Sequence, residues 1–375
     1  MAVNYVALSI PIFLILMGME IFLSLRSPKK VYRFNDSISN LSNGLGQQAV
    51  GIFSKMVLFL GYKYIYDHFA YFDFSNPTII HWLIALLMAD ISYYFFHRVS
   101  HRVNLLVGSH VVHHQSEEYN LSVALRQSWL TRFYSWIFYI PMAIVGVPPL
   151  MFLTISAIVI IYQFWVHTQF ISTLGVFESI FVTPSHHRVH HGRNPEYVDK
   201  NYGGIFIWWD MLFGTFEKEK EKVVYGIINP ANTWNPLYAN FRYYKTIYSE
   251  AKKASHFIDK IKIWFSPPEW RPRNLESYGP IPTISNIKLE KYNVGRNSTI
   301  NLLIALQFTI SLAIMAFVFV NKKELSSLAT AGMIGLVIWC LTNIAGIQEN
   351  KRWALKAQLL FFSTLIIGIY LQFLT

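Results

Sequence analysis

The chain has 375 residues, of which 53% are hydrophobic and only 14% are charged, with a formal net charge of +11. A soluble domain carries roughly 25% charged residues, so this composition excludes an ordinary water-exposed surface and indicates an integral membrane protein. The single cysteine, Cys340, excludes an intramolecular disulfide framework and an iron–sulfur cluster held by the chain's own cysteines. The basic excess is more typical of loops that face anionic lipid than of nucleic-acid binding, so we expect no nucleic-acid partner.

The first hundred residues contain three apolar runs, each near the length of roughly 20 residues that crosses a bilayer. The runs cover residues 3–25, 44–65 and 78–96. The second is weaker because Lys55 interrupts it, although a lysine side chain can extend to the interface. Four basic residues follow the first run and predict that this end faces the cytoplasm: Arg26, Lys29, Lys30 and Arg33.

A helical hairpin is predicted in the middle of the chain. Residues 97–128 are too polar to cross, and two apolar runs then cover 129–145 and 150–166. They meet at Gly146-Val147-Pro148-Pro149, a sequence that breaks helices. We therefore expect the chain to enter the membrane and return on the same side. Residues 170–298 then form a long cytoplasmic segment, with proline breaks at 266–268 and 280–282.

Three further spans are expected at 300–320, 325–347 and 354–373, with Lys351, Arg352 and Lys356 on the cytoplasmic side of the last two. The predicted fold class is therefore all-α, a polytopic membrane protein with a histidine-rich cap. Residues 1–298 are expected to form a membrane-embedded catalytic domain, with its core at 78–216, and residues 299–375 a C-terminal three-helix segment. With the amino terminus outside, helix counting places the histidine-rich stretches on the cytoplasmic face.

Ten of the thirteen histidines lie between residues 97 and 191, and most are three or four residues apart. On a helix such residues share one face, so each cluster presents its imidazoles in one direction. Neutral imidazole is the commonest protein ligand for transition metals, whereas packed imidazoles without a metal would repel each other or need buried partners. The sequence therefore predicts nine metal ligands: His97, His101, His110, His113, His114, His167, His187, His190 and His191.

The last cluster leaves a choice between His186 and His187. We favour His187, because with His190 and His191 it reproduces the spacing of the second cluster, which is formed by His110, His113 and His114. His186 could instead pair with His190 or support a ligand. The other three histidines, His68, His81 and His256, lie outside the pattern, and no ligand role is expected for them.

The ligand pattern differs from several familiar metal sites. The zinc-protease signature His-Glu-x-x-His is absent, because Arg98 follows His97 and Val111 follows His110. The spans also lack the glutamate set of soluble di-iron bundles. Nine histidines exceed the ligands of one zinc ion, and they fit two six-coordinate ions with positions open for oxygen.

The spacing of the clusters over residues 78–216 resembles the fatty acid hydroxylase/sterol desaturase superfamily of membrane di-iron enzymes. Two stretches resemble its alkylglycerol monooxygenase subgroup in particular. One is 116–128 (SEEYNLSVALRQS); the other is 183–194 (TPSHHRVHHGRN), continued by 201–204 (NYGG) and 209–216 (WDMLFGTF).

The superfamily resemblance implies two non-haem irons, dioxygen, a membrane lipid substrate and an external electron donor. The subgroup resemblance implies hydroxylation of the carbon next to an ether oxygen, which gives a hemiacetal that breaks down to an aldehyde and a glycerol derivative. It also implies tetrahydrobiopterin as the electron donor, a cofactor for which no separate sequence motif is present.

Three polar residues are further candidates for a catalytic role: Asp90, Glu118 and Asn120. Asp90 is the only formal charge within the third span, and it could orient a histidine or form a structural polar pair. Glu118 and Asn120 follow the second cluster closely enough to face the metals or a head group, although Glu117 and Glu118 could also be a solvated charge pair. Arg126 could hold a head group or mark the interface.

Two alternatives remain open from the sequence. One is a fatty acid or sterol hydroxylase or desaturase with the same centre. The other is a histidine-rich metal transporter, although transporters place such ligands near the bilayer midplane. The expected location is the inner membrane of a bacterium or the endoplasmic reticulum of a eukaryote.

Overall fold

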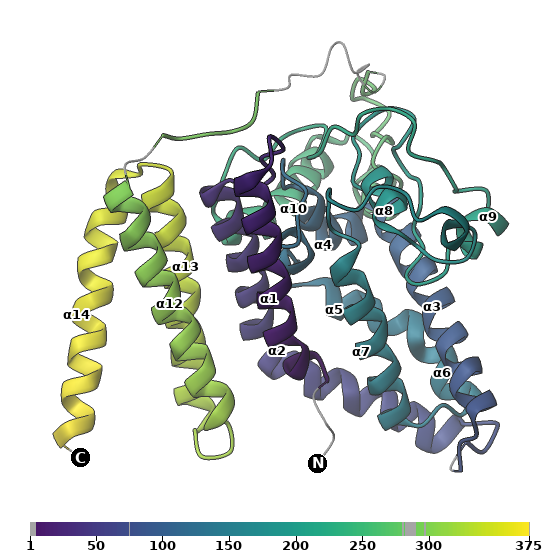
Figure 1. Ribbon diagram of the computed structural model, residues 1–375, viewed down its shortest axis with the longest axis horizontal. Helices are drawn as coiled ribbons and strands as arrows, with labels where there is room; N and C mark the ends of the chain where they lie inside the picture. Colours follow the sequence, from purple (N-terminus) through teal and green to yellow (C-terminus); the bar gives the residue numbers. More distant parts are fainter. Residues whose placement is uncertain (1–4, 75, 280, 282–289, 296–297, 375) are drawn as a thin grey trace.

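The computed structural model describes residues 5–74, 76–279, 281, 290–295 and 298–374. Within these residues every regular element is a helix, and the only extended pairings are two isolated bridges, Phe181 with Phe206 and Gly192 with Tyr225. This confirms the all-α expectation. Figure 1 shows long helices descending side by side beneath a cap of short helices and loops, with α12, α13 and α14 at one side of the molecule.

Four helices of the described chain are long and apolar enough to cross a membrane, over Leu8–Arg26, Ile79–Arg102, Thr299–Val320 and Ser327–Gln348. They belong to α1 (Tyr5–Arg26), α3 (Ile79–Arg102), α12 (Ser298–Val320) and α13 (Ser327–Gln348). The last predicted span corresponds to α14 (Arg352–Leu374), a helix of 23 residues. Residues 3 and 4 of the first predicted run, and 280 and 282 of a predicted proline break, lie outside the described residues.

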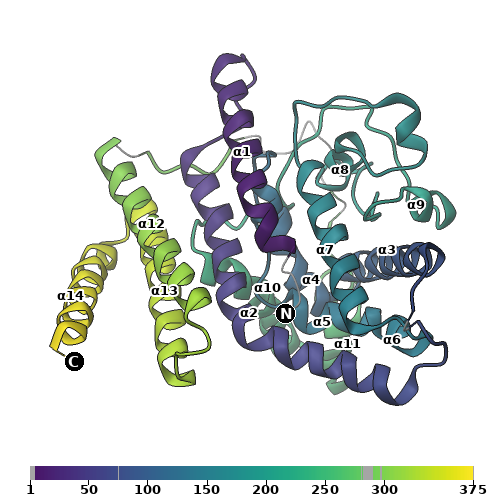
Figure 2. The same ribbon diagram turned by 60° about the horizontal axis from the view of Figure 1, so that its bottom comes forward.

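The second predicted span differs from the structure, where α2 (Phe34–Phe69) is a single helix of 36 residues and is not one of those four. It descends beside α1, bends, and then runs across the lower ends of the other helices (Figures 1 and 2). Its first half buries polar side chains and packs tightly on residues 125–129. A Cβ atom at Gly44 would overlap the Leu125 carbonyl, and one at Gly46 would overlap the Trp129 indole. The pattern of apolar residues showed neither the bend nor the polar start.

The predicted hairpin is present, but its first arm is broken into short pieces: α5 (Thr131–Ser135), η2 (Trp136–Tyr139) and α6 (Ile140–Val145). Pro141 lies in the first turn of α6, where its missing N–H is tolerated. Gly146 then turns the chain with φ of 113°, and a Cβ atom there would collide with the Phe72 carbonyl. The second arm is one helix, α7 (Pro149–Trp165), as expected.

The cap contains α4 (Asn104–His114), η1 (Val123–Leu125), η3 (Gly175–Ser179), α8 (Pro184–His190), α9 (Trp208–Leu212), α10 (Pro236–Lys253) and α11 (Phe257–Phe265). One hydrophobic core lies between α3, α6 and α7, and another joins α2 to the C-terminal helices. Ala49 and Ile52 of α2 pack in that second core with Val337 and Leu341 of α13. The C-terminal helices therefore pack against α2.

Candidate metal centre

Four stretches of the chain bring their histidines together at the cap end of α3. His97 and His101 lie at the end of α3, the second cluster on α4, His167 just after α7, and the last cluster on and directly after α8. They form two groups in which the candidate ligand atoms all lie within 4.8 Å of one another. The first group is His97, His101, His110, His114 and His190; the second group is His113, His167, His187 and His191.

The two groups contain all nine histidines that the sequence singled out, and His187 lies in the second group while His186 lies outside both. The Nδ1 atom of His186 accepts from the Thr183 backbone N–H at 3.4 Å and so helps to begin α8. His81 makes the same kind of contact with Thr78 at the start of α3. These two histidines therefore cap helices.

Backbone carbonyls orient four of the nine rings. The Nδ1 atom of His97 donates to the Tyr202 carbonyl at 2.9 Å, and that of His190 donates to the Lys200 carbonyl at 2.9 Å. In the second group, the Nδ1 atom of His113 donates to the Arg126 carbonyl at 3.0 Å, and that of His167 to the Gln163 carbonyl at 2.7 Å. A carbonyl can only accept, so Nδ1 carries the proton in each ring and Nε2 presents its lone pair.

These tautomers make the two groups fit a metal. The Nε2 atoms of His113 and His167 face each other at 3.2 Å, and two lone pairs cannot form a hydrogen bond. The Nε2 atoms of His101, His190 and His191 are buried without a hydrogen-bond partner in the described chain. One cation in each group would satisfy the nitrogens of that group at once, and ligating imidazoles in proteins are arranged in this way.

A proton is a poor substitute for that cation, because burial lowers the pKa of these rings. Burial lowers the pKa of His113 to about 4, although its hydrogen bond to Arg126 opposes the shift. Burial and the neighbouring imidazoles also lower the pKa of His167 and of His187 well below the usual range. The rings outside the membrane span are therefore neutral near pH 7, which is the form that binds metal.

The loop 199–204 supports the first group. Asp199 lies 3.6 Å from Nδ1 of His101, and hydrogen bonds and charge from His101 and Arg102 lower the pKa of Asp199 to about 2 against the opposing effect of burial. The carboxylate of Asp210 accepts from the backbone N–H groups of Tyr202 and Gly203, both at 2.7 Å. It thereby fixes the Tyr202 carbonyl that orients His97.

Asp90, within α3, contacts the residues that directly follow this loop. Its carboxylate accepts from the backbone N–H groups of Ile205 at 2.6 Å and Phe206 at 3.0 Å, and from the Trp209 indole at 2.9 Å. A Cβ atom at Gly204 would lie 2.5 Å from Asp90 Oδ1, so a glycine at this position allows the backbone to come close to the carboxylate. In the described contacts Asp90 touches this segment and none of the nine histidines, so it acts on the histidines only through the loop.

Arg126 and Tyr119 border the second group. The Arg126 side chain is 2% exposed and donates to the Val112 carbonyl at 2.7 Å, while its own carbonyl orients His113. Tyr119 is fully buried, stacks on His167 at a centroid distance of 5.6 Å, and donates to the Val166 carbonyl at 2.9 Å. The second group therefore rests on the segment after α4 and on the end of α7.

Glu118 and Asn120 have other partners than the histidines. Glu118 is 4% exposed and forms ion pairs with Arg33 at 2.5 Å and with Lys291 at 2.7 Å. The Asn120 amide donates to the Val31 carbonyl at 2.6 Å and accepts from Ser122. Both residues therefore join the segment directly after His114 to the chain before α2. Glu118 forms buried ion pairs and is not a solvated charge.

Glu20 lies beside the second histidine group, although the sequence analysis did not assign it to the site. Its carboxylate, 4% exposed within α1, accepts from Tyr32 at 2.6 Å, from the Leu121 backbone at 2.8 Å and from Thr168 at 2.5 Å. Thr168 directly follows His167. The signal in the sequence was that Glu20 is the only charge in the first apolar run, since intramembrane acids are functional candidates.

Comparisons with known proteins agree with this geometry. The fatty acid hydroxylase family model matches residues 82–215. Alkylglycerol monooxygenase of Homo sapiens is 35% identical over 351 residues, which are 93% of this chain and 78% of that protein. The protein of the same name from Danio rerio is 35% identical over 360 residues, covering 95% and 80%. Ornithine lipid hydroxylase OlsE of Rhizobium tropici is 29% identical over 141 residues, covering 37% and 43%. No solved structure matches.

Proposed function

Because the chain belongs to the alkylglycerol monooxygenase family, we propose that it hydroxylates the carbon next to the ether oxygen of an alkylglycerol-type lipid. It is a membrane monooxygenase that hydroxylates lipid, as its hydroxylase domain and its relatives indicate. The hydroxylated carbon carries both the new hydroxyl and the ether oxygen. This hemiacetal breaks down to an aldehyde and a glycerol derivative, which cleaves the ether.

The observation that carries the proposal is the convergence of nine histidines in two groups, in which every ring except that of His101 is buried. We propose that each group holds one iron ion, with the nine histidines as ligands and His187 as the ligand from its pair. When bound, iron supplies the redox chemistry that uses dioxygen to attack an unactivated C–H bond. Nitrogen ligands of this kind suit iron, zinc and copper, so the choice of iron rests on the family.

The chain's own residues bind and orient the metals and keep water away. Carbonyls of the 199–204 loop and of Arg126 hold the rings, and we assign Asp90 and Asp210 a positioning role through that loop. Glu118 and Asn120 hold the segment directly after His114 in place. Among the nine rings His101 alone is half-buried, and the others are buried, so the reaction takes place away from bulk solvent.

The electron donor and the orientation are also part of the proposal. Insertion of one oxygen atom into a C–H bond reduces the other atom to water and needs two electrons and two protons, and tetrahydrobiopterin is the donor we propose. The groups lie where α3 ends, and we place this end of the molecule on the cytoplasmic side. The alkyl chain would reach it from the bilayer between the spans, in the inner membrane of a bacterium or the endoplasmic reticulum of a eukaryote. Residues 1–298 would form the catalytic domain and 299–375 the C-terminal segment.

The test is metal analysis of the purified protein together with a lipid panel. Alkylglycerol, sterol and free fatty acid are each supplied with oxygen, with and without tetrahydrobiopterin, and aldehyde and hydroxylated products are measured. We expect iron near two per chain and pterin-dependent aldehyde from alkylglycerol alone. Turnover of sterol without pterin would contradict the ether-lipid assignment. Metal uptake into vesicles without a lipid product would instead indicate transport.

A further inference from the structure

The short helix α11 presents an apolar face to the outside of the molecule. Four of its nine residues are large apolar side chains with high exposed fractions: Phe257 73%, Ile258 67%, Ile261 49% and Phe265 62%. On a helix with 3.6 residues per turn these four lie within an arc of about 100°. Apolar side chains gathered in this way on an exposed surface mark a site of interaction, so this face needs a partner.

Two lysines border the apolar face of α11. By the same helical spacing, Lys260 lies on one side of the arc and Lys262 on the other, and both side chains are exposed. A helix with a strongly apolar face bordered by lysines is typical of helices that lie in the interface of a membrane. There the apolar side chains enter the acyl region and the lysines extend to the head groups.

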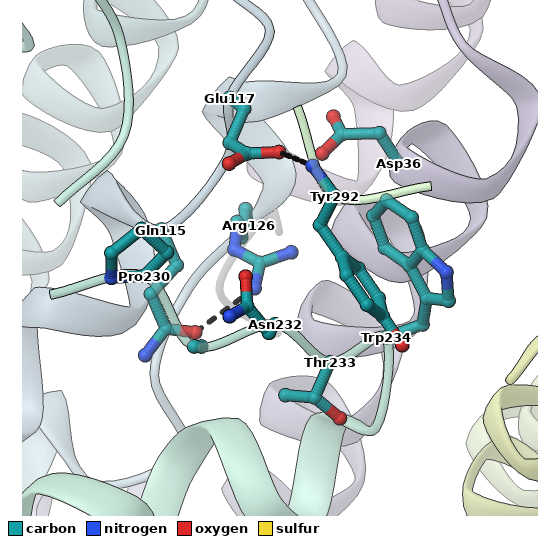
Figure 3. Close-up of a pocket in the computed structure, with 10 residues that line it drawn as sticks. Asp36, Gln115, Glu117, Arg126, Pro230, Asn232, Thr233, Trp234 and Tyr292 are labelled. Carbon is teal, nitrogen blue, oxygen red and sulfur yellow. Dashed lines mark hydrogen bonds between the residues drawn. The ribbon is translucent and has the colours of Figure 1, made fainter. Parts of the chain in front are cut away.

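The positive charge of these lysines is not balanced by acids. In the part of the chain that the structure describes, neither Lys260 nor Lys262 forms a salt bridge, and the one acid of α11, Asp259, is 1% exposed and pairs with Arg273 at 3.5 Å. Acids elsewhere in the cap have internal partners too, as Glu117 accepts from the Tyr292 backbone N–H at 2.7 Å (Figure 3). The outer surface of α11 therefore attracts an anionic partner.

The opposite side of α11 is fixed to the protein. Ile263 is fully buried and packs in a small core with Ile247 and Ala251 of α10. The Asn104 amide donates to the Ile263 carbonyl at 2.8 Å, and the Asn104 backbone N–H donates to the Ser266 carbonyl at 3.0 Å. Because these contacts set its orientation, α11 cannot turn its apolar face inwards.

The attachment at Asn104 also sets the level of α11, since α3 ends two residues earlier, at Arg102. The 24 residues of α3 are about 36 Å long, compared with about 30 Å for the hydrocarbon core of a bilayer, so this end of α3 lies at the membrane interface. Helix α10, on which α11 packs, lies at the level of the upper ends of α1 and α12 (Figure 1). Nine residues are too few to cross the bilayer, so α11 lies along its surface.

We infer that α11 lies in the membrane interface, with its apolar face among the acyl chains and with Lys260 and Lys262 on the phosphates of anionic lipids. The inference depends on the membrane spans and not on the proposed reaction. It also gives α11 a role in the cap. Helix α4, which carries three of the histidines, begins at Asn104, so the contact of α11 with lipid holds α4 at a fixed distance from the membrane surface.

The experiment places one fluorescent label on α11 of the full-length protein in lipid vesicles. Cys340 is replaced by alanine, and the label is attached to a cysteine introduced as Ile261→Cys or, in a second variant, as Phe257→Cys. Lys222→Cys is the control, because Lys222 is exposed within the charged segment 217–222 (EKEKEK). Phosphatidylcholine with a nitroxide on its acyl chain should quench both α11 labels strongly and the control label weakly.

The preference for charge is measured with the label at Ile261→Cys. Nitroxide-labelled phosphatidylglycerol and phosphatidylcholine are compared at equal mole fractions. We expect the anionic lipid to be enriched beside α11, by about fivefold for each lysine that contacts it. Lys260→Gln combined with Lys262→Gln should remove this preference. The matched control, Lys218→Gln combined with Lys222→Gln, removes the same charge from the 217–222 segment and should keep it.

Two results would overturn the inference. Weak quenching at both α11 positions, in protein that elutes as a single species from gel filtration, would show that the face does not touch lipid and is left for a soluble partner. Equal quenching by the two lipids would show that the lysines do not bind anionic head groups. Strong quenching together with a preference that only the α11 lysine variant loses would support it.

Discussion

The two histidine groups use the same kind of ligand but are held in place by different parts of the chain. The first group depends on the loop 199–204, which lies after the last histidine cluster and is fixed by Asp210. The second group depends on Arg126, on the end of α7 and on the stacked ring of Tyr119. This difference indicates that separate residues orient the rings of each group. A substitution among the residues that orient one group should therefore leave the other group intact.

The largest effect is expected from removing a ligand of either group. His113→Ala takes a nitrogen from the second group and His190→Ala takes one from the first. We expect product formation to fall to background in both, because two ions act together, while metal content falls by roughly half if the sites load independently. Metal analysis and the aldehyde assay check this. A fully active His113→Ala protein would count against the assignment.

A smaller, one-sided effect is expected from Asp210→Asn. Tyr202 and Gly203 donate to different oxygens of Asp210, and asparagine replaces one of these oxygens with an NH2 group that cannot accept. The loop around the Tyr202 carbonyl should therefore shift, and His97 should lose its orientation. We expect roughly 10- to 100-fold weaker metal binding at the first group, as for other changes behind a ligand. The second group should keep its metal, measured by titration with a chelator. Equal loss from both groups would show that their supports are not separate.

Lowering the pH should weaken metal binding at the first group of the unmodified protein, as Asp210→Asn does. Burial raises the pKa of Asp210 to about 6, so the carboxylate is charged above pH 6 and becomes protonated below it. Protonation removes part of its capacity to accept from the loop, and metal release from the first group should increase between pH 7 and pH 5. Asp210→Asn should lack this part of the pH dependence. An unchanged pH profile in the variant would exclude Asp210 as the source.

The smallest effect is expected at the other group, from Tyr119→Phe. Phenylalanine keeps the stack on His167 and loses the hydrogen bond to the Val166 carbonyl, which contributes about 1 kcal/mol to the free energy of unfolding. We expect a slightly lower melting temperature in detergent and unchanged metal content. Tyr119→Leu also removes the stack and should loosen the second group alone. Loss of metal from the first group in Tyr119→Leu would contradict the comparison.

The histidine clusters could be predicted because their spacing is local. His97 and His101 must share a face of any helix that contains them, and the same holds for the clusters on α4 and α8. How the two groups divide the rings could not be predicted, since His113 and His114, adjacent in sequence, belong to different groups. That division depends on how helices from distant parts of the chain pack.

The supports were harder to predict for the same reason. Glu118 meets Lys291 across 173 residues, and no periodicity links the two positions. Asp90 was recognised as a buried acid, but its partners at Ile205 and Phe206 depend on how the loop folds over α3. The close packing of α2 against Leu125 and Trp129 likewise joins segments that are far apart in the sequence.

Glu20 has a consequence for how the protein is made. Its carboxylate holds Thr168, next to a histidine of the second group, across 148 residues of sequence. The α1 helix therefore meets this partner only after a much later part of the chain has been synthesised, and the segment next to His167 lacks this support until then. We therefore expect the second group to bind metal fully only after membrane insertion, when α1 and the end of α7 have come together, and not on the growing chain.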